Sequence, residues 1–298
     1  MIVLVALVAG ALPALAGCGQ GIVPGSGPPA VVAAESTWGS IASQLGGTRA
    51  PVQSIITNPA EDPHAYEPTA VDARTLATAS LVIVNGAGYD PWASRLLAAN
   101  PTPGRIVLDV GRLLHVGQGG NPHRWYDPAD VRVVAGTIAA DLERLDPRHR
   151  AAYRAALARF EQIDLARYER LIRGIRARYA GVPVGASESI FALLAPALGL
   201  RVLTPPGFMK AVSEGSEISA GDAATAAAQI SSHTIRVWVF NVQNATPEIS
   251  RLNGLARARG IPVVTITETL SPASATFQSW QVAQLTELAR ALREATGR

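Results

Sequence analysis

The feature that most constrains the fold is an uninterrupted helical segment near the middle of the chain. Residues 148–180 contain no proline and a single glycine, Gly174, and alanine, leucine, arginine and glutamate dominate them. Apolar side chains recur there at close to helical spacing, at Leu157, Phe160, Ile163, Leu171, Ile172 and Ile175. About 30 helical residues span about 45 Å, more than the usual globular helix. The pattern predicts one connecting helix over residues 146–180, with two shorter helices broken at Gly174 as the alternative.

Short β-branched runs alternate with helical segments on both sides of this helix. Before it, strands are expected at residues 30–34, 52–56, 81–84 and 105–110, and helices at residues 37–45, 70–78, 91–99 and from 128 onward. After it, strands are expected at residues 182–185, 201–203, 237–240 and 262–266, and helices at residues 189–197, 221–230, 247–259 and 276–295. Such alternation is typical of parallel sheets covered by helices. We therefore predict an α/β protein of two similar lobes, residues 30–145 and 181–298, joined by the connecting helix.

The first residues indicate export. Residues 1–17 form an apolar run that ends in small residues before Cys18, as in a secretory signal peptide, and the run is too short to span a bilayer. Leu-Ala-Gly before Cys18 resembles a bacterial lipobox, which implies that Cys18 carries a lipid and anchors the protein at the cell membrane. Residues 18–29 then form a flexible tether. No Lys or Arg precedes the apolar run, which suggests a start codon further upstream; a free buried cysteine is the alternative.

Charge and cysteine content exclude several classes of protein. The net charge is only +3, and the scattered arginines give no basic patch, which argues against nucleic acid binding. Gly117 to Gly120 lacks the strand-to-helix glycine pattern of a phosphate-binding loop. Cys18 is the single cysteine, so once it is lipidated no thiol is left for catalysis, redox chemistry or metal ligation.

Two of the five histidines occur in matching contexts. His64 and His123 each follow a proline, and an aromatic residue, Tyr66 or Trp125, comes two positions later. Both loops come after a predicted strand, at the sheet edge where α/β proteins bind ligands. The preceding proline stiffens the loop, so that each imidazole is held in place before a ligand arrives. We therefore expect His64 and His123 to share a metal site, whereas a lone histidine is more often structural or exposed.

The second lobe is expected to supply a carboxylate. Glu188 comes where a predicted strand ends and a helix begins, a position at which a negative charge is favoured. The alternative is that Glu188 is an ordinary residue of the first helical turn. His115, His149 and His233 are weaker candidates, and we interpret them as loop or solvated residues.

These motifs together resemble a known family. The chain is similar to the metal-binding substrate-binding proteins of bacterial ABC importers, the cluster A-I family of zinc and manganese receptors. The likeness depends on the long helix and on five motifs: Asp62-Pro-His64, Pro68-Thr69, Asn85-Gly-Ala-Gly-Tyr89, Asn121-Pro-His123-Arg-Trp125-Tyr-Asp-Pro128 and Ala186-Ser-Glu188. The resemblance implies a metal site in the cleft between two lobes, with His64, His123 and Glu188 as ligands. It also implies a non-enzymatic monomer that hands its ion to a membrane permease.

The chain departs from the family at the fourth ligand. An aspartate or glutamate is usual just before the C-terminal helix, but residues 274–280 contain no carboxylate. Glu268, at the end of the last predicted strand, is the nearest substitute, and water or an oxygen of Gln243 or Thr276 are the alternatives. The long His- and Asp-rich loop of many zinc members is also missing.

The expected ligands suit zinc, manganese or ferrous iron. Zinc comes first because it binds such sites more tightly than manganese, the second choice. A zinc hydrolase is a rival interpretation, although no HExxH motif is present. Other rivals are a receptor for a metal chelate or vitamin, in which His64 and His123 would not share a ligand, and a structural lipoprotein.

Overall fold

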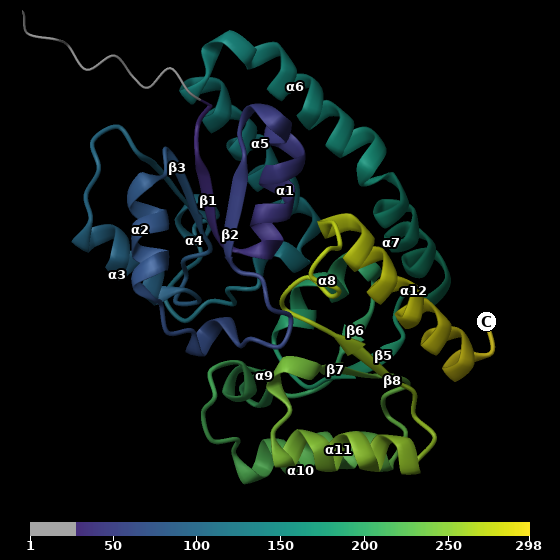
Figure 1. The fold of residues 1–298 in the computed structure, drawn as a ribbon. Helices are drawn as coiled ribbons and strands as arrows, with labels where there is room; N and C mark the ends of the chain where they lie inside the picture. Colours follow the sequence, from purple (N-terminus) through teal and green to yellow (C-terminus); the bar gives the residue numbers. More distant parts are fainter. Residues whose placement is uncertain (1–27) are drawn as a thin grey trace, which may run out of the picture.

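The computed structural model describes residues 28–298 and confirms an α/β fold with two four-stranded parallel sheets. The predicted signal peptide, Cys18 and most of the predicted tether lie outside the described residues. Figure 1 shows the N-terminal lobe in purple and blue, the C-terminal lobe in green, and the long helix along one side of both. In the described part of the chain, no helix combines the length and the apolar character needed to cross a membrane.

The first sheet has the strand order β2-β1-β3-β4. Its strands are β1 (Val31–Glu35), β2 (Val52–Ile56), β3 (Leu81–Val84) and β4 (Ile106–Asp109). Five helices belong to this lobe: α1 (Ser36–Gly46), α2 (Ala70–Thr78), α3 (Pro91–Ala99), α4 (Val110–Leu113) and α5 (Pro128–Leu145). β1 and β3 are buried along their whole length, as expected for central strands covered on both faces. Local sequence sets the helix starts, since Thr69 and Asp72 form a capping box and Asp127 caps α5 before Pro128.

The second sheet has the order β6-β5-β7-β8. Its strands are β5 (Pro183–Ala186), β6 (Arg201–Val202), β7 (Trp238–Asn241) and β8 (Val263–Ile266). Its helices are α8 (Ile190–Leu198), α9 (Pro206–Ser213), α10 (Ala220–Ser231), α11 (Pro247–Ala258) and α12 (Phe277–Thr296). None of the helices predicted from the sequence corresponds to α9. This helix starts at a proline and buries Phe208, Met209 and Val212, a short apolar stretch without a long periodic signal.

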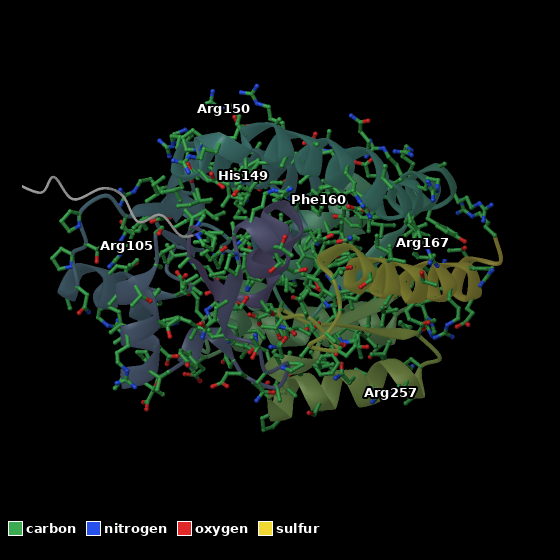
Figure 2. The ribbon with its side chains drawn as sticks, turned by 45° about the horizontal axis from the view of Figure 1, so that its top comes forward. Arg105, His149, Arg150, Phe160, Arg167 and Arg257 are labelled. Atoms are coloured by element: carbon green, nitrogen blue, oxygen red, sulfur yellow. The ribbon has the colours of Figure 1, made fainter. Side chains whose placement is uncertain are left out.

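The connection between the lobes is a long helix with one irregular turn. It begins with the 3-10 turn η4 (Pro147–His149), continues as α6 (Arg150–Arg159) and the π-helical turn η5 (Phe160–Asp164), and ends as α7 (Ala166–Tyr179). α7 runs through Gly174 without a break, so the single helix is correct and the interruption at Gly174 is not. Phe160 lies on the inner side of this helix, whereas Arg150 projects outward at its start (Figure 2).

One apolar core extends through the whole molecule. It includes Trp38 of the first lobe, Phe160 and Ile172 of the long helix, and Trp238 and Leu285 of the second lobe. α12 returns from the second lobe to pack along α7, as Figure 1 shows in yellow and teal. A smaller cluster covers the other face of the first sheet. The lobes are therefore joined by shared packing as well as by the covalent connection.

Candidate metal site

The two histidines lie on short, stiff turns of the first lobe. His64 lies in the 3-10 turn η2 (Pro63–Ala65), where Asp62 Oδ1 accepts its backbone N–H at 2.9 Å. His123 precedes the 3-10 turn η3 (Arg124–Tyr126). Asn121 Oδ1 lies 3.1 Å from the backbone N–H of His123 and 3.0 Å from its Nδ1. Since that oxygen only accepts, Nδ1 of His123 carries the hydrogen and Nε2 keeps a free lone pair.

The carboxylates come from the second lobe. Glu188 follows β5 by two residues and Glu268 follows β8 by two residues, and both are buried. Asn241 ends β7, the strand between them. The register pairs Ala186 with Val239 and Asn241 with Ile266, so both glutamates leave the sheet beside Asn241.

The structure brings the four predicted site residues together. Nε2 of His64 and Nε2 of His123 are 3.4 Å apart, and Glu268 Oε2 lies 3.6 Å from each of them. Glu188 Oε1 lies 3.4 Å from His123 Nε2. The donor atoms of His64, His123 and Glu268 all lie within 4.8 Å of one another, and Glu188 adjoins this group through His123. A tetrahedral zinc with bonds of about 2.0–2.2 Å has edges of about 3.3–3.6 Å.

Burial and charge shape the protonation of this cluster. Glu188 Oε1 is buried and has no hydrogen-bond partner in the described part of the chain, and burial raises the pKa of Glu188 to about 7. Burial alone would raise the pKa of Glu268 as well, but His123, His64 and Tyr89 lower it to about 2. Burial lowers the pKa of His64. In His123 burial acts in the same direction, but the charges of Glu188 and Glu268 outweigh it and raise the pKa. An orphaned carboxylate oxygen facing imidazole nitrogens fits a bound cation.

Tyr89 and Trp125 form the wall around the histidines. The ring centroids of His64 and Tyr89 are 4.5 Å apart, and those of His123 and Trp125 are 5.4 Å apart. The Tyr89 hydroxyl also donates to Glu268 Oε2 at 2.9 Å, a hydrogen bond from one lobe to the other. Both side chains are fully buried, and their packing holds the imidazole rings in position.

The other residues considered from the sequence lie elsewhere. Gln243 supports the site, because its Oε1 accepts the backbone N–H of Glu268 at 2.5 Å. Thr276 caps α12. His115 lines a separate surface pocket with Asp109, and His149 lies 2.6 Å from Asp146 Oδ2.

Asn241 was missed by the sequence analysis. Its Nδ2 donates to Glu188 Oε2 and, at 2.7 Å, to Glu268 Oε1. The signal in the sequence is an amide at the end of a buried strand, which is too common to single out.

A family comparison connects this geometry to known proteins. The family model described as "Zinc-uptake complex component A periplasmic" (ZnuA) matches residues 31–291. The chain belongs to this family. The family consists of substrate-binding proteins rather than enzymes, so the hydrolase interpretation is wrong.

Individual relatives are named for different metals. The manganese-binding lipoprotein MntA of Halalkalibacterium halodurans is 30% identical over 122 residues, 39% of this chain and 40% of that protein. The iron-binding protein YfeA of Yersinia pestis is 28% identical over 173 residues, 54% of each chain. The chain thus aligns with about half or less of the length of these curated relatives. The fold matches the periplasmic metal-binding protein of Candidatus Liberibacter asiaticus, with a TM-score of 0.74 and 18% identity over 89% of this chain and 99% of that one.

Proposed function

We propose that the protein is an extracytoplasmic receptor that binds one divalent transition metal ion, zinc before manganese, and delivers it to an ABC importer permease. His64 and His123 bind the ion from one lobe, and Glu188 and Glu268 bind it from the other. The protein acts as a monomer, held at the cell membrane by a lipid on Cys18. The predicted lobes, residues 30–145 and 181–298, then close around the ion.

The observation that carries this proposal is that donor atoms of His64, His123 and Glu268 lie within 4.8 Å of one another, with Glu188 Oε1 beside them at His123. The separations of 3.4–3.6 Å are too long for good hydrogen bonds and close to the edges of a metal coordination shell. They leave no room between the donors for a chelate or a vitamin. Glu188 Oε1 has no hydrogen-bond partner among the residues that the structure describes, which supports its role as a ligand.

The test is metal content and calorimetric affinity of the protein that begins after Cys18. We expect about one zinc ion per chain, bound more tightly than manganese, and a loss of at least 100-fold in affinity in both His64→Ala and His123→Ala. His115→Asn is the matched control, since His115 has a positive φ that asparagine tolerates and lines a different pocket. A folded wild-type protein that binds no transition metal contradicts the proposal.

A further inference from the structure

Asn241 lies between the two carboxylates of the site and contacts both. Its side chain is fully buried at the end of β7, and β5 and β8 flank that strand. One nitrogen, Nδ2, donates to Glu188 Oε2 and to Glu268 Oε1. A primary amide has two N–H groups, so one asparagine satisfies both acceptors at once.

The orientation of this amide is fixed by the backbone. Asn241 Oδ1 accepts the N–H of Gln243 at 3.2 Å as the turn η6 (Val242–Asn244) begins. A flipped amide would place its NH₂ group against that backbone donor and its oxygen against two carboxylates. The observed orientation is therefore the one in which every polar atom of the side chain has a partner.

Each carboxylate has one oxygen that Asn241 does not hold. In Glu268 this oxygen, Oε2, accepts the Tyr89 hydroxyl and keeps a second lone pair for the ion. Asn241 holds Glu188 Oε2 and Glu268 Oε1, and the remaining oxygens, Glu188 Oε1 and Glu268 Oε2, are those that lie 3.4 and 3.6 Å from His123 Nε2. Two imidazole nitrogens and two single carboxylate oxygens make four ligands. If both carboxylates chelated the ion, the same residues would supply six.

We propose that Asn241 is a specificity-determining residue that keeps both glutamates monodentate and so selects a four-coordinate ion. Zinc accepts four ligands in a tetrahedron, whereas manganese and calcium favour six or more, with chelating carboxylates among them. This inference rests on the proposed function, because it concerns the same site. It assigns the discrimination between metals to a residue that does not touch the ion.

The first experiment compares zinc and manganese affinities in the wild type and in Asn241→Ala. Without the amide, both glutamates are free to chelate. Loss of such an outer hydrogen bond costs about 10–100-fold in the affinity of the favoured metal. We expect zinc affinity to fall by this factor and manganese affinity to fall less or to rise, so that the ratio of zinc to manganese affinity drops at least tenfold. Equal weakening of both metals would show a merely structural role and overturn the inference.

Asn244→Ala is the matched control. Of the two carboxylates, Asn244 Nδ2 donates to that of Glu268, at Oε1 and 3.3 Å, so its loss leaves Glu188 held by Asn241. The zinc to manganese ratio should then stay within about threefold of the wild-type value. A drop as large as that of Asn241→Ala would overturn the assignment to Asn241.

The second experiment needs no variant and covers the case in which Asn241→Ala does not fold. Cobalt(II) replaces zinc, and its visible absorption is intense in a four-coordinate site and weak in a six-coordinate one. We expect the intense spectrum from the wild-type protein, and a weaker one from a folded Asn241→Ala. A weak wild-type spectrum overturns the inference while leaving the receptor function standing. If neither zinc nor cobalt binds the folded wild type, the proposed function itself fails.

Discussion

At the scale of single residues, His123 and Glu188 connect metal binding to pH. The pKa of His123 is raised, and that of Glu188 is raised to about 7, so both groups bind protons more readily in the metal-free site than they ordinarily do. A cation must displace these protons. Below pH 7 they compete with the metal more strongly.

We therefore predict that zinc affinity falls as the pH is lowered from 8 to 5. The fall should approach tenfold per pH unit for each proton displaced. Calorimetry in buffers of different ionisation enthalpy measures the number of protons released. An affinity that stays constant across this range would contradict imidazole ligation.

Glu35 is a buried carboxyl group of the first lobe that lies outside the metal site. Both of its oxygens are buried and have no hydrogen-bond partner among residues 28–298, and its pKa is raised well above the ordinary value by burial and by the charge of Asp90. Asp90 itself accepts the backbone N–H groups of Asn85 and Gly86, each at 2.7 Å. Burial and the neighbouring charge of Asp90 therefore favour the protonated form of Glu35 in the folded protein.

The raised pKa of Glu35 predicts how the free energy of unfolding depends on pH. The folded state binds a proton that the unfolded state releases above about pH 4.3, so the free energy of unfolding falls by about 1.4 kcal/mol per pH unit from this group as the pH rises towards the folded pKa. Glu35→Gln keeps a hydrogen-bond donor but removes the ionisable carboxyl group. We therefore expect the variant to gain stability relative to wild type at pH 8 and not at pH 4. Urea denaturation of the metal-free proteins at both values measures the difference, and an identical pH dependence in the two would contradict it.

At the scale of elements, the long helix depends on its irregular turn. The π-helical turn η5 (Phe160–Asp164) widens the helix where Phe160 enters the core, while Ile163 in the same turn is 66% exposed. Such turns need a compensating interaction, and here burial of an aromatic ring supplies it.

We predict that Phe160→Ala costs about 3–5 kcal/mol of unfolding free energy, the usual loss for a buried aromatic ring. Ile163→Ala in the same turn should cost less than about 0.5 kcal/mol, because its side chain is exposed. Denaturant unfolding checks both, and zinc affinity of the folded variants should match the wild type. Equal costs for the two substitutions would show that η5 does not depend on the buried ring.

At the scale of the whole molecule, several contacts hold the lobes together. Asn121 Nδ2 donates to Ser189 O at 2.6 Å, the Tyr126 hydroxyl to Thr267 O at 2.8 Å, and Gln243 Nε2 to Glu61 O at 2.9 Å. With the continuous apolar core, they favour a small closing motion over a wide hinge. The imidazole of His64 is the one partly exposed member of the site, at 22%, and marks the side on which an ion enters or leaves.

A bridging ion should stabilise the whole molecule as one unit. Zinc at 1,000 times its dissociation constant adds about 4 kcal/mol to the free energy of unfolding. We predict a single calorimetric transition that moves to higher temperature with zinc and returns with a chelator. His64→Ala should lose the shift and keep the metal-free melting temperature within a few degrees. Two transitions, of which only one responds to zinc, would show that the ion does not bridge the lobes.

Most of the local structure follows from short-range patterns in the sequence. β-branched runs, caps and prolines placed the strands and helices to within a few residues, because hydrophobic periodicity and capping act over short stretches of chain. The same local rules put His64 and His123 on stiff loops at one sheet edge. These rules did not predict α9, because its eight residues, which begin at a proline, show too little hydrophobic periodicity.

The tertiary structure decided how the second half of the site is built. Glu188, Asn241 and Glu268 are far apart in the sequence, and no local pattern relates them. They meet because β7 pairs with both β5 and β8, so that three chain segments leave one sheet edge side by side. Strand order and register depend on long-range pairing, and those interactions bring Glu268 beside the two histidines and place the Asn241 amide between the two carboxylates.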